Sequence, residues 1–236
     1  MTDLTFARRY PAEAADRDCL DPAFAQALLD NGRWQRLVIL GDSVAAGVRD
    51  PLDGYRDLSM GERLAEALAA TRPEFRQRTL AQPFLRAAEI REKFLPDALA
   101  FEPDLVLVSA GANDAFSRGF DAGRLTAELD ALLRPLASAG ATVATIGLYD
   151  WARSGLLPAE TATQTALNLD EVDVVQRYVV EDVGGIHLGA RQIAAGRDPA
   201  MYSADGIHGN ARGHAIAFAN FVRHLSAYRA VPDWLR

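Results

Sequence analysis

Residues 37–47 read LVILGDSVAAG, which joins a run of four apolar residues to a turn of small and polar residues. A continuous apolar run of this length is typical of a strand buried on both faces of a parallel sheet. A second run, LVLV, stands at residues 105–108, and residues 141–148 (ATVATIGL) form a third candidate. Residues 75–81 and 185–188 are weaker candidates for two more strands.

Segments with helical periodicity separate these candidate strands. Ser59 and Glu62 form the signature of a capping box, which predicts a helix beginning at residue 60. Apolar residues recur at helical spacing in residues 125–136, 169–179 and 218–225. Alternation of strands and helices predicts an α/β protein with a parallel sheet covered by helices on both faces. In such folds the functional site forms at the carboxyl ends of the strands.

The domain organisation follows from the position of the first strand. Residues 1–35 precede it and are predicted to be an N-terminal extension with a short helix, which begins at Asp21 and Pro22. Residues 36–236 show no repeat and no break in composition, so we expect them to form one domain.

Composition narrows the class of protein. The formal net charge of −7 argues against a general nucleic-acid surface. The single cysteine, Cys19, excludes an internal disulfide and a cysteine-rich zinc site, and it fits a reducing compartment. No stretch is apolar over the length that a membrane helix needs. We therefore expect a soluble cytoplasmic protein, and the sequence does not determine its oligomeric state.

Polar motifs follow or flank three of the predicted elements. They are GDS at residues 41–43, GAND at residues 111–114 and DGIH at residues 205–208. Each motif alone has a structural explanation: Ser43 as a helix cap, Asn113 as a turn residue, and the last motif as a loop acid with a capping histidine.

Taken together, the three motifs supply the groups that ester hydrolysis requires. Ser43 is the candidate nucleophile, and His208 is the candidate general base because imidazole titrates near neutral pH. Asp205 stands three residues before His208 and can orient its ring. Asn113 can direct its side-chain amide at the developing oxyanion, together with the backbone N–H of Ser43.

The three motifs resemble the first, third and fifth sequence blocks of the SGNH, or GDSL, hydrolases, in the family's order and at roughly its spacing. The resemblance extends from about residue 37 to about residue 225. It implies a flavodoxin-like, three-layer α/β/α fold with about five parallel strands. It also implies cleavage of carboxylic esters of small alcohols, lipids or sugars, with no metal and no cofactor.

The second block of that family is altered in this chain. The family has a glycine there whose N–H is an oxyanion donor, but residues 79–86 read TLAQPFLR and contain no glycine. Family spacing places the donor near Phe84. The backbone N–H of Phe84 can still serve, but a positive φ at this residue would be strained. Loss of one such donor costs on the order of 100- to 1,000-fold in rate.

The substrate-binding residues are predicted from apolar side chains near the presumed site. Trp151 and Leu156 follow the fourth candidate strand, and Leu85 follows Phe84. Packing at the surface or an oligomer contact is the alternative role for Trp151 and Leu156. A zinc site formed by His208 and His214 is set aside, because the two residues would not share a helix face.

Three other functions remain open. An acyltransferase of the same fold would use the same residues and deliver the acyl group to an alcohol. A degenerate family member would bind a ligand without turnover, and the missing glycine of the second block is the observation in its favour. A flavin-binding or nucleotide-binding protein fits the sequence less well than these two alternatives, since the chain lacks a phosphate-binding loop.

Overall fold

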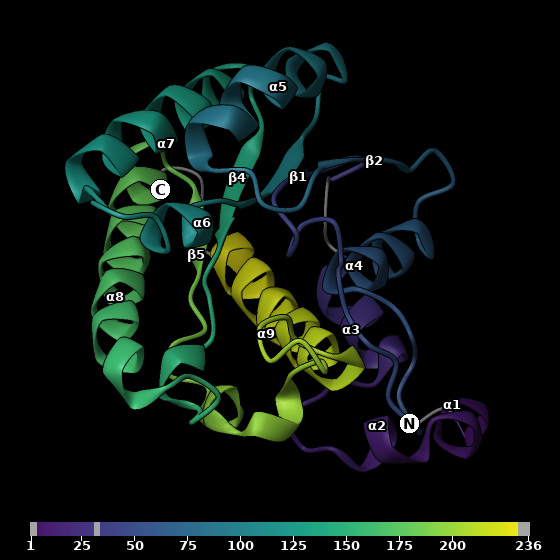
Figure 1. The fold of residues 1–236 in the computed structure, drawn as a ribbon. Helices are drawn as coiled ribbons and strands as arrows, with labels where there is room; N and C mark the ends of the chain where they lie inside the picture. The colour runs from purple at the N-terminus through teal and green to yellow at the C-terminus, as the bar shows by residue number, and fades with distance from the viewer. Residues whose placement is uncertain (1–3, 31–33, 231–236) are drawn as a thin grey trace. The chain divides into compact units, whose positions relative to one another are not determined.

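A five-stranded sheet forms the centre of the α/β fold in the computed structural model, which describes residues 4–30 and 34–230 (Figure 1). The strands lie in the order β2-β1-β3-β4-β5. Their bounds are β1 Arg36–Gly41, β2 Arg76–Ala81, β3 Leu105–Ser109, β4 Thr142–Ile146 and β5 Ile186–Leu188. The pairs β1–β3, β3–β4 and β4–β5 are parallel. This order is that of the flavodoxin-like class, and all five candidate strands of the sequence are confirmed.

The strands differ in burial as their sequences differ in polarity. Every residue of β3 is buried, and so is every residue of β1 after Arg36. Continuous apolar runs are therefore placed at the centre of the sheet, where both faces are covered. β2 stands at the edge of the sheet, and Leu80 is its one buried residue. Its charged residues suit an edge, because charge there discourages pairing with a second chain.

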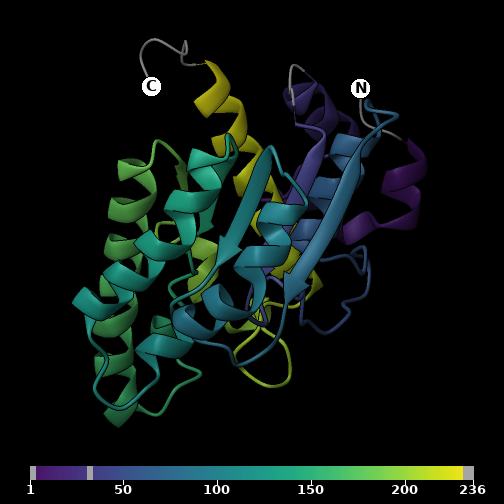
Figure 2. The ribbon, with the colours of Figure 1, turned by 90° about the horizontal axis from the view of Figure 1, so that it is seen from above.

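The chain divides into two compact units. Unit 2 comprises residues 36–46 and 77–199 and contains the sheet, apart from Arg76. Its long helices are α5 Ala87–Ala100, α7 Ala122–Ser138 and α8 Ala159–Asp182. α7 packs between α5 and α8, and the three helices also contact β1, β4 and β5 (Figure 2). They form a helical layer on the sheet.

The sequence signals for α7 and α8 are confirmed by their buried faces. The five leucines of the periodic segment in α7 are all buried, and Gly140 follows the helix with φ 97°. In α8 the buried residues include Leu169, Val172, Val175 and Val179. α5 was not identified from the sequence. Its first turn carries a capping box of Arg86 and Glu89, which lacks the usual serine or threonine cap.

Unit 1 comprises residues 1–35, 47–76 and 200–236. Its helices are α1 Leu4–Arg9, α2 Pro11–Ala15, α3 Pro22–Leu29, α4 Met60–Ala69 and α9 Ala211–Ala230. α3, α4 and α9 pack against one another. The capping box of Ser59 and Glu62 at α4 is confirmed, and the Asp21 carboxylate caps α3. The apolar face of α9 is buried through Phe218, Phe221, Val222 and Leu225.

A buried ion pair links the N-terminal segment to the rest of unit 1. Glu13 and Arg63 are 2% and 1% exposed, and two hydrogen bonds of 2.5 and 3.1 Å join their side chains. Glu13 also accepts a hydrogen bond from the backbone N–H of Arg56. Removing one partner of such a pair would leave an uncompensated buried charge. Within the described part of this segment, α2 is thus tied to α4 by charge and α3 by packing.

Short helices complete the described structure: α6 Ala112–Ala115, η1 Trp151–Arg153, η2 Ala194–Arg197 and η3 Pro199–Met201. Within residues 4–30 and 34–230, no helix combines the length and the apolarity needed to cross a bilayer.

Candidate active site

Gly41 ends β1 and approaches the neighbouring strand closely. It pairs with Ser109 at the end of β3 and has φ 146°. A Cβ atom on Gly41 would lie 2.0 Å from the carbonyl oxygen of Ser109. Only glycine fits here, both for its φ and for the close approach. The backbone therefore turns sharply just before Ser43.

Asp42 holds this turn in place. It is 1% exposed, and its Oδ1 accepts hydrogen bonds from the backbone N–H of Val44 (3.0 Å) and from the Ser109 hydroxyl (2.8 Å). Asp42 thus acts as a local hydrogen-bonding residue. No role was predicted for Ser109. Its position at the end of the strand beside β1 was the signal that could have identified it.

Ser43 lies directly after Gly41 and Asp42 in the chain and is 8% exposed. No helix follows β1 directly. Residues 43–47 form turns, the backbone N–H of Ala46 bonds to the carbonyl of Asp42, and Gly47 has φ 75°. The next helix, α4, begins at Met60.

Asn113 and Asp114 connect α6 to the loop after β2. The Asn113 amide donates a hydrogen bond of 2.9 Å to the carbonyl of Leu85, and Asp114 accepts one of 3.0 Å from the backbone N–H of Ala87. Burial raises the pKa of Asp114, and the hydrogen bond from Ala87 only partly opposes this. The two side chains thus fix the loop that contains Phe84.

Phe84 has a positive φ of 70°, the conformation that the sequence analysis expected to be strained at this position. Its side chain is not covered by other parts of the protein, since the residue is 82% exposed. A bulky residue in this region of φ is strained. Phe84 therefore takes the backbone conformation of a glycine at the position where the family has a glycine.

The three predicted substrate-binding residues differ in exposure. Trp151 is buried, and its ring meets that of Phe116 edge-on at 5.6 Å between centroids. Leu156 is 38% exposed, and Leu85 is half-buried. A cavity of about 400 Å³ opens nearby, between the residues after η1 and the start of α8. It is lined by Ala152, Arg153, Gly155, Leu157, Ala159, Ala162, Thr163, Ala166 and Leu167, and by none of the three predicted residues.

Asp205 and His208 form a hydrogen-bonded pair. Nδ1 of His208 lies 2.6 Å from Oδ2 of Asp205, and Oδ1 of Asp205 accepts from the backbone N–H groups of Ile207 and His208. Burial raises the pKa of Asp205, but the hydrogen bonds from His208 and the backbone outweigh this and lower it below its usual value. A carboxylate on Nδ1 keeps the proton there and leaves Nε2 as the basic nitrogen.

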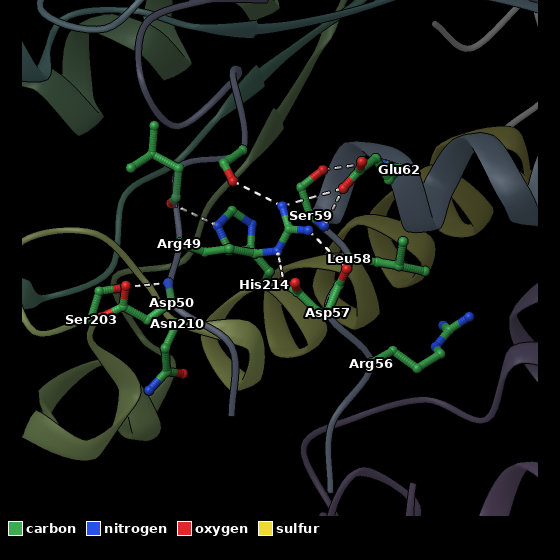
Figure 3. A network of polar contacts seen from close by, with 12 residues as sticks. Arg49, Asp50, Arg56, Asp57, Leu58, Ser59, Glu62, Ser203, Asn210 and His214 are labelled. Carbon is green, nitrogen blue, oxygen red and sulfur yellow. Dashed lines mark hydrogen bonds and ion pairs between the residues drawn. The ribbon is translucent and has the colours of Figure 1, made fainter. Parts of the chain in front are cut away.

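The loop that carries this pair is fixed at several points. Ser203 donates its backbone N–H to the carbonyl of His208 at 2.7 Å. Its hydroxyl accepts from the backbone N–H of Asp50 (Figure 3). The Asp50 carboxylate accepts from the backbone N–H of Ala204. Asn210 donates to the carbonyls of Ala200 and Tyr202. The segment around Asp50 therefore supports the loop from the side.

His214 has a structural role in α9. It is 4% exposed and lies between the backbone N–H of Met60 (3.2 Å to Nδ1) and the carbonyl of Val48 (3.3 Å to Nε2). Burial lowers the pKa of His214 to about 4, so the ring is neutral at physiological pH. His187 is also engaged, by Thr145 and Asp173.

The candidate catalytic residues come from both units. Ser43, Phe84 and Asn113 belong to unit 2, whereas Asp205 and His208 belong to unit 1. In the described part of the chain, no three histidine, cysteine, aspartate or glutamate side chains are grouped to hold a metal ion.

Comparison with known proteins identifies relatives at the level of family and fold. Residues 39–216 match the GDSL-like Lipase/Acylhydrolase family. No curated protein matches the sequence.

Several solved structures share the fold. The α/β hydrolase LAE5 from the metagenome of Lake Arreo is 20% identical, with a TM-score of 0.64 over 82% of this chain and 95% of that one. The psychrotrophic esterase EstA from Pseudoalteromonas sp. is 16% identical, with a TM-score of 0.62 over 84% and 100%. Axe2, an acetylxylan esterase from Geobacillus stearothermophilus, is 17% identical, with a TM-score of 0.64 over 86% and 96%.

Proposed function

The chain belongs to the GDSL-like lipase/acylhydrolase family, and we propose that it cleaves carboxylic esters with a triad of Ser43, His208 and Asp205. The observation that carries this proposal is the pairing of Asp205 with Nδ1 of His208 at 2.6 Å. A base that is oriented in this way is what a serine nucleophile needs, because the unassisted hydroxyl is a weak nucleophile.

In the proposed mechanism, Nε2 of His208 takes the proton of the Ser43 hydroxyl as its oxygen attacks the ester carbonyl carbon. The tetrahedral intermediate collapses to an acyl-enzyme, and His208 gives the proton to the departing alkoxide. Water then attacks the acyl-enzyme by the same route, which releases the acid and restores Ser43. Asp205 stabilises the imidazolium that forms in each step.

We assign the oxyanion donors to the backbone N–H groups of Ser43 and Phe84 and to the amide of Asn113. The hydrogen bond from Asn113 to Leu85 supports this assignment, because it uses one of the two amide N–H groups and joins α6 to the loop of Phe84. Donors that are fixed before the reaction stabilise the developing charge without reorganisation.

The relatives are consistent with these roles. Catalytic mutants of Axe2 replace a serine, an aspartate and a histidine by alanine. Its aspartate stands three residues before its histidine, which is also the spacing of Asp205 and His208. EstA is inhibited by monoethylphosphonate, and phosphonates of this kind are therefore suitable probes for Ser43.

The substrate proposed is a small ester with an apolar group, bound by Leu85, Trp151 and Leu156. The partial exposure of Leu85 and Leu156 supports a role in binding, and the Trp151 ring is fixed by its edge-on contact with Phe116. We also propose a cytoplasmic location, because the single cysteine, Cys19, suits a reducing compartment.

Hydrolysis of p-nitrophenyl acetate, butyrate and octanoate by the wild type and by Ser43→Ala tests the proposal. We expect the variant to lose at least about 1,000-fold in kcat. Ser138→Ala, which changes an exposed serine at the end of α7, is the matched control and should keep full activity. A phosphonate should label the wild type and not Ser43→Ala. Absence of both turnover and labelling in the wild type would contradict the proposal and favour a ligand-binding protein.

A further inference from the structure

Phe84 combines two unfavourable features. Its φ of 70° is strained for a side chain with a Cβ atom, and its ring is left in solvent, with the residue 82% exposed. Glycine would remove the strain, and a polar residue would remove the exposed apolar surface. Packing within the protein explains neither feature, because so little of the residue is covered.

The conformation is imposed by hydrogen bonds on both sides of Phe84. Before it, the backbone N–H of Gln82 bonds to the carbonyl of Gly41 at 3.0 Å. After it, the carbonyl of Leu85 and the backbone N–H of Ala87 are held by Asn113 and Asp114. A strained residue persists where its surroundings over-determine it, and such residues gather at functional sites.

The same hydrogen bonds place Phe84 beside the proposed chemistry. Gly41, which holds Gln82, stands two residues before the nucleophile Ser43, and Asn113 is a proposed oxyanion donor. All of these residues belong to unit 2. A ring fixed on this loop can cover the apolar part of an ester whose carbonyl oxygen is bound by the N–H of Phe84 itself.

We propose that the Phe84 side chain contacts the substrate and makes the enzyme prefer esters with a larger apolar group over esters with a smaller one. This inference rests on the proposed function. It gives Phe84 a second role, because its side chain determines specificity while its backbone N–H is an oxyanion donor. The ring provides a flat apolar surface that is dehydrated only when the substrate binds, so its contribution should grow with the apolar area of the substrate. The apolar group is either the acyl chain or the alcohol of the ester.

Two pairs of substrates distinguish a contact with the acyl chain from a contact with the alcohol. p-Nitrophenyl acetate and p-nitrophenyl hexanoate differ in the acyl group, whereas ethyl acetate and benzyl acetate differ in the alcohol. We expect Phe84→Ala to raise KM for the larger member of one pair roughly 5- to 30-fold, and to change KM for the smaller member far less. Phe84→Leu should have an intermediate effect. The pair that responds identifies the group that lies on the ring.

The strain requires its own control. Glu102 is the other non-glycine residue with positive φ, 51°, in the described part of the chain, and its side chain is 84% exposed. Phe84→Gly and Glu102→Gly should therefore both raise Tm, but only Phe84→Gly should change the ratio of KM values. Inactivation by hexyl and ethyl phosphonates gives a second measurement that does not depend on turnover, and Phe84→Ala should slow inactivation by the hexyl compound more.

The outcomes distinguish this inference from the proposed function. If Phe84→Ala leaves KM unchanged, or raises it equally for both members of each pair, the ring does not contact the substrate. That result overturns the inference while the enzyme remains an esterase. If the wild type cleaves no ester and no phosphonate labels Ser43, the proposed function fails and the inference fails with it.

Discussion

Gly41 and Ser109 are paired so closely that a single methyl group on Gly41 would meet the Ser109 carbonyl oxygen at 2.0 Å. The pairing brings the end of β1 against the end of β3. Asp42 then bridges the same two segments by accepting the Ser109 hydroxyl. The turn that presents Ser43 thus depends on a contact between residues far apart in the chain.

We expect Gly41→Ala to lower the free energy of unfolding by roughly 3 kcal/mol or more, because it adds a steric clash to a strained φ. Gly155→Ala is the matched control, since Gly155 also has a positive φ, 86°, but nothing lies within 4 Å of the added Cβ. Its cost should stay near 1 kcal/mol. Urea unfolding measures both changes in the free energy of unfolding. Equal decreases in the two variants would show that the close approach of Gly41 to Ser109 does not affect stability.

Glu13→Ala should destabilise the protein by about 3–5 kcal/mol, because it leaves the buried guanidinium of Arg63 without its partner. Asp130→Ala removes one of two carboxylate partners of the exposed Arg134 on α7, and it should cost about 1 kcal/mol or less. Denaturant melts of the two variants make the comparison. A small loss for Glu13→Ala would argue that residues 1–35 contribute little to the stability of unit 1.

Stability should fall between pH 6.5 and about pH 4 because of His214. Its pKa is about 4 in the folded protein and near 6.5 in the unfolded chain, so in this range the unfolded state binds more protons. One such group lowers the free energy of unfolding by about 3 kcal/mol across the range. His214→Asn should flatten this dependence. If the free energy of unfolding of His214→Asn depends on pH as in the wild type, His214 is not the cause of the fall in stability.

Asp50→Ala should lower kcat roughly 10- to 100-fold with little change in KM. It removes the acceptor for the Ala204 N–H and loosens the loop of Asp205 and His208, and small misplacement of a catalytic group is costly. Asp50→Asn keeps an acceptor oxygen and should restore most of the activity. Asp57→Ala is the control, because Asp57 binds the neighbouring Arg49 and not the loop (Figure 3). A rise in KM without a fall in kcat, or no recovery of activity in Asp50→Asn, would rule out this positioning role.

The sequence by itself determined what depends on near neighbours along the chain. The apolar runs at residues 37–40 and 105–108 became buried strands, since four apolar residues in a row can be buried on both faces of a sheet. The capping box of Ser59 and Glu62 satisfies the first turn of α4 within three residues. The spacing of three positions from Asp205 to His208 likewise allows their hydrogen bond within one loop.

The tertiary structure decided what depends on residues distant in the chain. The 2.0 Å approach of Gly41 to Ser109, the bond of Asn113 to Leu85 and the burial of Glu13 against Arg63 each join segments 28 or more residues apart. No local pattern encodes such pairs, because their energy depends on which elements the sheet brings together. The strained φ of Phe84 has the same origin. Its sequence neighbours permit other conformations, and hydrogen bonds from β1 and α6 select the one that is observed.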